Sequence, residues 1–257
     1  MIIKLNETYH IKVISYLKRD KDFNLFIIGD IERYGYNTYF LDIWASIDEK
    51  GNIQGVLLKY FEYLIFYSHG EFNVDEFSNL INDLNYTEIS GKLEVLQKLD
   101  DKIKTKYKRV VKFCTLENNI SLDDTKTGLN PKKIRFGNIN KVVKLYDSIS
   151  EFENTTVENI KNLLKTGRGY CIELNKKVVA MAKSTLETRT HAMIVGVGTH
   201  PDFRNMGLAT KCIVKICNEI IDENKTPCLF YDNIEAGKIY KKLGFKEKGD
   251  WAIYYKS

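Results

Sequence analysis

The chain has 257 residues, of which 44% are hydrophobic and 28% are charged, and its formal net charge is +5. That length is enough for one large domain or two ordinary domains, and that composition excludes a disordered chain. The positive charge suits an anionic ligand. No run of lysine and arginine is dense enough to indicate a nucleic-acid partner.

The 5 cysteines include no Cys-x-x-Cys pair, and the 4 histidines are scattered along the chain. This pattern predicts reduced cysteines in the core and no metal site. No segment of membrane-spanning length is free of charged residues, and the N-terminal segment has no long apolar run and no cleavage signal. We therefore expect a cytoplasmic monomer or homodimer without a membrane partner.

Residues 1–125 are predicted to form a first α/β domain. Apolar periodicity indicates two short helices, a strand, a hairpin, a helix, a short strand with a further helix, and a closing strand. These elements cover residues 14–17, 23–31, 40–47, 53–61, 63–68, 74–84, 86–103 and 110–116. Residues 117–131 are polar and rich in turn-forming residues, so we expect a linker there.

Residues 132–257 are predicted to form a second domain. The pattern indicates a strand, two helices, three strands joined by tight turns, a helix, a strand, a helix and a last strand. These elements cover residues 133–136, 138–148, 156–165, 169–174, 178–186, 189–199, 207–221, 227–231, 234–243 and 245–255. The fold class is thus α+β, with helices and strands in mixed order.

The two domains share one succession of elements, since residues 40–84 and 170–221 each contain a strand, a turn, a hairpin strand and a helix. This indicates a degenerate repeat, although an unrelated α+β unit is the alternative. At the start of the helix the first copy carries Glu71, Asp75 and Glu76, which would repel a phosphate. We expect only the second copy to bind an anionic cofactor.

Residues 193–209, MIVGVGTHPDFRNMGLA, are predicted to be a buried strand, a loop and the first turn of a helix. Pro201 ends the strand because it has no N–H for a ladder hydrogen bond. The first N–H groups of the helix have no partner within it, and its dipole adds positive charge. Arg204 adds a full charge, and Gly207 lets a ligand approach the backbone. This segment therefore predicts a site for a phosphate or pyrophosphate.

Two other phosphate motifs fail on the same residues. Gly196-x-Gly198 follows a strand, but Pro201 stands where a dinucleotide fingerprint needs its third glycine, and no helix has begun there. A Gly-x-x-x-x-Gly-Lys-Ser/Thr segment does not occur in the sequence, which excludes a P-loop.

Two motifs resemble those of one family. Arg204-x-x-Gly207-x-Ala209 resembles the acyl-CoA pyrophosphate loop of the GCN5-related N-acetyltransferases. Downstream, Asn233-x-x-Ala236-x-x-Ile239-Tyr240-x-x-x-Gly244-Phe245 resembles their second signature, in the expected order. The resemblance covers residues 132–257 and implies the GNAT acyl-CoA N-acyltransferase fold, with a fused N-terminal α/β domain that is itself a candidate degenerate copy.

The resemblance also implies roles for single residues. Tyr240 would donate a proton to the leaving sulfur; its alternative is a packed aromatic whose hydroxyl is satisfied by backbone. The strand backbone would pair with the pantetheine arm, the loop backbone would hold the pyrophosphate, and an asparagine would hydrogen-bond near the cofactor. The cofactor-binding residues are Val197, Gly198, Thr199, Arg204, Asn205, Met206, Gly207, Leu208, Ala209 and Asn233.

The implied function is transfer of the acetyl group from acetyl-CoA to a primary amine. The long N-terminal domain favours a small-molecule acceptor. The general base stays open between Glu187, His191 and a water relay, with Glu173 a weaker candidate. A longer acyl donor and a non-catalytic acyl-CoA-binding module are the alternatives, because a fold does not fix a function.

Overall fold

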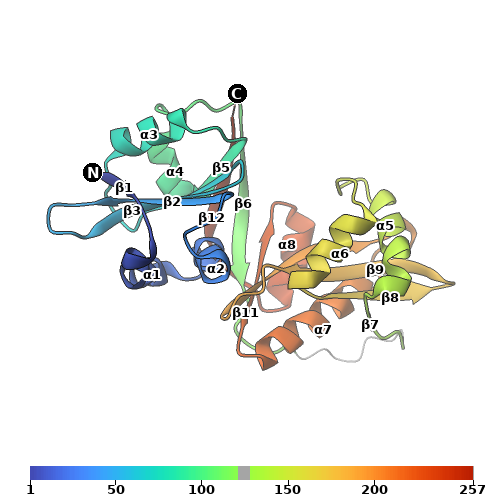
Figure 1. Cartoon of the computed structure of the whole chain (residues 1–257). Helices are drawn as coiled ribbons and strands as arrows, with labels where there is room; N and C mark the ends of the chain where they lie inside the picture. Colours follow the sequence, from blue (N-terminus) through green and yellow to red (C-terminus); the bar gives the residue numbers. More distant parts are fainter. Residues whose placement is uncertain (121–127, 257) are drawn as a thin grey trace. The chain divides into compact units, whose positions relative to one another are not determined.

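The computed structural model describes residues 1–120 and 128–256 (Figure 1). The chain divides into two compact units. Unit 1 contains residues 1–113 and the C-terminal segment from residue 248, and unit 2 contains residues 114–247. The predicted linker 117–131 includes residues 121–127, which lie outside the described part of the chain.

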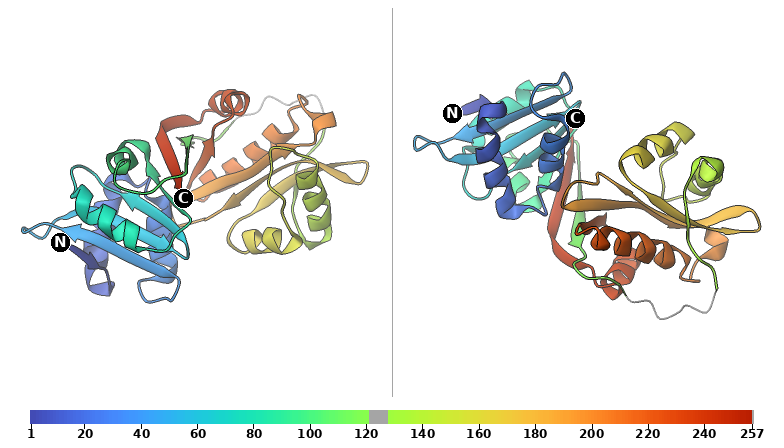
Figure 2. Two further views of the ribbon diagram at one scale, coloured as in Figure 1. Left: turned by 90° about the horizontal axis from the view of Figure 1, so that it is seen from above. Right: turned by 60° about the horizontal axis from the view of Figure 1, so that its bottom comes forward.

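Unit 1 is a twisted sheet with helices on both faces (Figures 1 and 2). Its strands stand in the order β1-β2-β3-β4-β5-β12-β6, with β4 and β5 parallel. Helices α1 and α2 cover one face and α3 and α4 the other, each pair over its own apolar core. The elements are β1 (Ile2–Lys4), η1 (Glu7–Tyr9), α1 (His10–Leu17), η2 (Lys18–Asp20), α2 (Leu25–Tyr34), β2 (Leu41–Ile47), β3 (Ile53–Tyr60), β4 (Tyr63–Tyr67), α3 (Val74–Asp83), β5 (Glu88–Lys92), α4 (Leu93–Leu96), η3 (Gln97–Leu99), β6 (Tyr107–Thr115) and β12 (Lys246–Tyr255).

Unit 2 repeats this layered arrangement, with α5 and α6 on one face of its sheet and α7 on the other (Figure 1). Its strands stand in the order β11-β10-β9-β8-β7, and β10 and β11 are parallel. The elements are β7 (Lys132–Lys133), η4 (Phe136–Asn138), α5 (Ile139–Asp147), α6 (Val157–Thr166), β8 (Gly169–Leu174), β9 (Lys177–Thr185), β10 (His191–Thr199), η5 (Pro201–Phe203), α7 (Leu208–Asp222), β11 (Thr226–Tyr231) and α8 (Ile234–Lys242).

The internal repeat is confirmed, and it is longer than predicted. The order β1-α1-α2-β2-β3-β4-α3-β5-α4-β6 recurs as β7-α5-α6-β8-β9-β10-α7-β11-α8-β12. In both copies three antiparallel strands precede a helix that leads to a parallel strand. The mixed α/β fold class is therefore that expected from the sequence.

The last strand departs from the predicted division at residues 125 and 132. The part of β12 beyond residue 247 belongs to unit 1, where Trp251 stands opposite Lys92 of β5 in an antiparallel register. The choice of partner strand depends on long-range pairing, which neither periodicity nor turn signals encode. The boundary expected near residue 125 lies outside the described residues. The last described residue before it is Ile120, whose N–H donates to Asn218 Oδ1 of α7 at 2.8 Å.

The 5 cysteines are free and buried, as the sequence indicated. Among the described residues no helix is long and apolar enough to cross a membrane. In the same part of the chain no cluster of His, Cys, Asp or Glu is arranged to hold a metal ion.

Candidate active site

Strands β10 and β11 begin side by side and then separate. Their register contains three pairs, which end at Met193 opposite Cys228. Strand β10 continues to Thr199, and on its other edge it remains paired with β9, where Thr199 stands opposite Ala180. Beyond Met193, the backbone N–H and C=O groups on the edge of β10 that faces away from β9 therefore have no register partner in β11. An extended ligand arm can pair with such an edge.

A β-bulge lies on β10 where the strands have parted. Val195 stands opposite Lys183 and Gly198 opposite Met181, so two residues of β10 face one residue of β9. Gly196 in the bulge has a φ of +57°, a conformation that L side chains rarely adopt. The bulge turns the backbone of residues 196–198, and all three residues are partly exposed.

The loop from Arg204 to Gly207 presents N–H groups to solvent. Asn205 and Gly207 have φ values of +64° and +69°, and their alternation with extended or helical neighbours forms a concave turn of the backbone. The N–H groups of Asn205, Met206 and Gly207 donate no hydrogen bond to a described residue. A Cβ on Gly207 would meet no atom within 4 Å. The residues present therefore fit a bound pyrophosphate.

Helix α7 adds its own N-terminus to this loop. Gly207 is the N-cap, and no side chain caps the helix. The side chain of Leu208 is buried in the core, so this residue and Ala209 offer backbone N–H groups to a ligand. The macrodipole of the 15-residue helix favours an anion here.

Arg204 extends over the same surface. Its guanidinium lies 3.1 Å from Glu151 Oε2, and both side chains are about half exposed. The hydrogen bond from Arg204 lowers the pKa of the Glu151 carboxyl. Arg204 is thus an exposed cation whose present partner is a second exposed side chain.

Asn233 begins helix α8. Its Oδ1 accepts hydrogen bonds from the N–H groups of Glu235 and Ala236 at 2.9 and 3.1 Å, which is an N-cap arrangement. This capping role is one that the sequence interpretation did not include. The asparagine preference at N-cap positions was a signal that could have found it.

Tyr240 lies on α8 within the core that α7 covers. Its ring centroid is 5.8 Å from that of Tyr231 and 5.9 Å from that of Phe245. The hydroxyl makes no hydrogen bond to a described residue. The described residues therefore do not show the alternative role, in which the backbone would accept a hydrogen bond from this hydroxyl. Burial, with smaller contributions from Cys217 and Cys114, raises the pKa of Tyr240 to about 12. The phenol therefore stays protonated at neutral pH.

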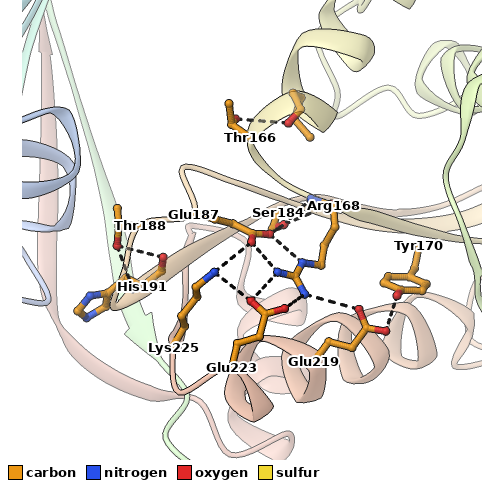
Figure 3. Close-up of polar contacts among 11 residues, drawn as sticks. Thr166, Arg168, Tyr170, Ser184, Glu187, Thr188, His191, Glu219, Glu223 and Lys225 are labelled. Atoms are coloured by element: carbon orange, nitrogen blue, oxygen red, sulfur yellow. Dashed lines mark hydrogen bonds and ion pairs between the residues drawn. The ribbon is translucent and has the colours of Figure 1, made fainter. Parts of the chain in front are cut away.

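The two side chains considered as a base lie at the opposite end of β10. Glu187 accepts two hydrogen bonds from the Arg168 guanidinium, at 2.9 and 2.6 Å, and one from Ser184 at 2.5 Å (Figure 3). Burial alone would raise the pKa of Glu187, but the hydrogen bonds from Arg168 and Ser184 and the charge of Arg168 outweigh it, and the pKa is lowered. Glu187 is thus an ion-paired carboxylate.

His191 is buried, and its Nδ1 lies 2.8 Å from the hydroxyl of Thr190. At about 3.3 Å per residue, its Cα is roughly 20 Å along β10 from Val197. Glu173 forms an ion pair with Lys141 at 3.1 Å. None of Glu187, His191 and Glu173 places a base without a hydrogen bond or ion pair at the bulge.

The structure brings most of the predicted cofactor-binding residues together. Val197, Gly198 and Thr199 end β10, and Arg204 to Ala209 follow after the single turn of η5. Asn233 and Tyr240 come from α8, which follows β11. Sequence reasoning missed Tyr146 and Lys183, which lie against the bulge; the one local signal was a lysine within the apolar strand VVAMAK.

The chain is similar to known proteins of one family. A family model described as GNAT acetyltransferase matches residues 46–254. A GCN5-related N-acetyltransferase from Sphaerobacter thermophilus aligns with a TM-score of 0.72 at 10% identity, over 100% of this chain and 95% of that chain. A GNAT-family acetyltransferase from Colwellia psychrerythraea aligns with a TM-score of 0.60 at 13% identity, over 100% of both chains.

A tandem GNAT protein from the clavulanic acid biosynthesis pathway aligns with a TM-score of 0.59 at 10% identity, over 99% of this chain and 97% of that chain. Such identities show a shared fold. No curated protein matches this sequence.

Proposed function

The chain belongs to the GNAT acetyltransferase family, and from this premise we propose that it transfers the acetyl group of acetyl-CoA to a primary amine of a small molecule. One observation carries the proposal. Strand β10 leaves β11 after Met193, and an uncapped loop and helix N-terminus follow where β10 ends. An unpaired strand edge that leads to an anion site suits a ligand with an extended amide-bearing arm and a pyrophosphate.

In this proposal the loop and the helix start hold the pyrophosphate. The N–H groups of residues 205–209 donate to its oxygens, and Arg204 supplies charge. The backbone of Val197, Gly198 and Thr199 pairs with the pantetheine arm and orients the thioester. Acetyl-CoA supplies the acetyl group and departs as the thiol. Fixing its orientation relative to the amine is itself a large part of the expected acceleration.

Tyr240 is proposed to protonate the departing sulfur. It is buried, protonated, and free of hydrogen bonds to described residues, so its proton is available when negative charge develops. Asn233 is proposed to act near the cofactor through its remaining amide group, while its oxygen caps α8.

Free-thiol release tests the proposal. The full chain is mixed with acetyl-CoA and, in turn, amino acids, polyamines, aminoglycosides and peptides. We expect amine-dependent thiol release above the rate without amine, with the acetylated product identified by mass spectrometry. Propionyl-CoA and longer donors in the same assay measure acyl selectivity. Binding of acetyl-CoA with no release for any amine would favour the non-catalytic binding module.

A further inference from the structure

Lys183 is buried in the sheet of unit 2 without an acidic partner. Its side chain on β9 is 2% exposed. Its Nζ is hydrogen-bonded to Tyr146 Oη and lies 4.3 Å from the centroid of the same ring. A lysine is rarely buried unless it is paired with a carboxylate, because desolvation disfavours its charged form. Burial lowers the pKa of Lys183 to about 8.

The groups around Lys183 come from three elements. Helix α5 brings Tyr146, whose pKa is raised to about 12 by burial. Strand β8 brings Gly169, and strand β10 brings Gly196, and neither has a side chain. No described carboxylate forms an ion pair with the Lys183 ammonium. Among the described residues, Tyr146 is the side chain to which the Lys183 amine is hydrogen-bonded.

The pair lies directly against the bulge of β10. A Cβ built on Gly196 would be 2.5 Å from Tyr146 Oη and 2.6 Å from Lys183 Cε. A Cβ on Gly198 would be 2.7 Å from Ile149 Cδ1. Any side chain at either position would displace these groups. The glycines thus let a phenol and an amine approach the backbone within one residue of Val197.

We propose that Tyr146 and Lys183 accept the proton that the acceptor amine loses during acetyl transfer. This inference rests on the proposed function, and it assigns a role that the sequence left open. Tyr146 is partly exposed whereas Lys183 is buried, so we place Tyr146 next to the substrate and Lys183 behind it. Tyr146 is the catalytic residue and Lys183 the positioning residue that acts through it.

The proton balance is as follows. The nitrogen of the acceptor forms the C–N bond, and the C–S bond breaks. One N–H proton passes to Tyr146 Oη while the Oη proton passes to uncharged Lys183 Nζ, which becomes an ammonium. Tyr240 gives its proton to the sulfur, and exchange with water then restores Tyr240 and Lys183. The relay requires Lys183 to be uncharged at the start, so turnover should rise with pH through the pKa of that amine.

The experiment compares pH profiles of the full chain between pH 6 and pH 10, using an acceptor found by thiol release. For the wild type we expect kcat to rise with a midpoint near pH 8. Tyr146→Phe keeps the ring and removes the hydroxyl, and Lys183→Met keeps the length and removes the amine. Both should lower kcat at least tenfold and remove that midpoint, while the Kd for acetyl-CoA stays within about twofold.

Tyr170→Phe is the matched control, because it removes another hydrogen-bonded tyrosine hydroxyl of unit 2, at 2.5 Å from Glu219. Its pH profile should match the wild type. The double variant should be no slower than the slower single variant, since two members of one relay are not additive.

Tyr146→Phe with the wild-type rate and midpoint would overturn the relay and leave acetyl transfer intact, even if Lys183→Met fails to fold. A wild type that acetylates no amine would refute the proposed function itself, and the relay with it.

Discussion

The guanidinium of Arg204 lies 3.1 Å from the carboxylate of Glu151, so the cation expected to meet a pyrophosphate already has an anionic partner. A ligand must displace or share that partner. Exposed pairs of this kind are worth about 0–1 kcal/mol. Glu151→Gln should therefore tighten acetyl-CoA binding by up to about fivefold in calorimetric titration. Glu153→Gln, a nearby exposed acid, is the control. Weaker binding in Glu151→Gln than in the wild type would contradict the displacement of Glu151 by the ligand.

Tyr240→Phe should reduce kcat by about 10²–10⁴-fold, which is the usual range for a positioned acid. Affinity for acetyl-CoA should change little, because the ring still packs against Tyr231 and Phe245. Steady-state kinetics and calorimetry measure the two effects separately. Tyr231→Phe is the control, since that hydroxyl is bound by Glu247. A Tyr240→Phe enzyme with the wild-type kcat would mean that another group protonates the sulfur.

Much of this site could be predicted because its signals are local. Each signal lies within a short stretch of the sequence: the apolar run before Pro201, the glycine at 207, and the spacing from Asn233 to Tyr240. The loop that these residues form is where the sequence placed it. The assignment of ligands to it stays a prediction.

The parts that could not be predicted depend on long-range contacts. Tyr146 and Lys183 are 37 positions apart, and nothing in either segment indicates that their side chains meet. Likewise, the sequence of β12 is that of any half-buried strand, and its register with β5 pairs Trp251 with Lys92 across more than half of the chain. Glu187 was considered as a base because it flanks the start of the central strand, and the sequence does not show its ion pair with Arg168, which comes from another segment.

Glu187→Gln should lower stability and leave catalysis unchanged. The substitution removes a carboxylate that holds Arg168 and Ser184, and hydrogen bonds to charged groups contribute about 1.5–3 kcal/mol. Because the folded-state pKa of Glu187 is lowered, its contribution is present above its unfolded pKa and is lost as pH falls below about 4.5. Denaturant unfolding at pH 7 and pH 3 measures this, and we expect the variant and wild type to converge in acid. A large fall in kcat at pH 7 would instead restore Glu187 as a base.

Lys183 should also make stability rise with pH, but in the alkaline range. Its folded-state pKa is lowered from 10.5 to about 8, so between these values the unfolded chain binds more protons and stability rises with pH. At about 1.4 kcal/mol per unit, the whole effect is about 3 kcal/mol. Denaturant unfolding of Lys183→Met should lack most of this rise between pH 8 and pH 10, whereas Lys177→Met on the same strand should keep it. Parallel curves for Lys183→Met and the wild type would contradict a buried, titrating amine.

Unit 1 repeats the fold without the features of the ligand site. The N-terminus of its α3 is capped by Asn73, whose side chain accepts from Glu76 N at 3.1 Å, and two acids lie in the first turn. A Cβ on Gly91 of β5 would lie 2.4 Å from the carbonyl oxygen of Phe66. Strand β5 therefore stays against β4, the strand that precedes α3, whereas β11 separates from β10. We expect no acetyl-CoA site in unit 1.

Calorimetric titration of the full chain with acetyl-CoA measures the stoichiometry and the place of binding together. We expect one site per chain, abolished by Gly207→Asn, because the added side chain would enter the open space that the loop presents. Gly128→Asn is the matched control, since Gly128 also has a positive φ of +60° with no atom within 4 Å of its Cβ, and binding should survive there. Two equivalent sites per chain, or one site that Gly207→Asn leaves intact, would contradict acetyl-CoA binding at the start of α7.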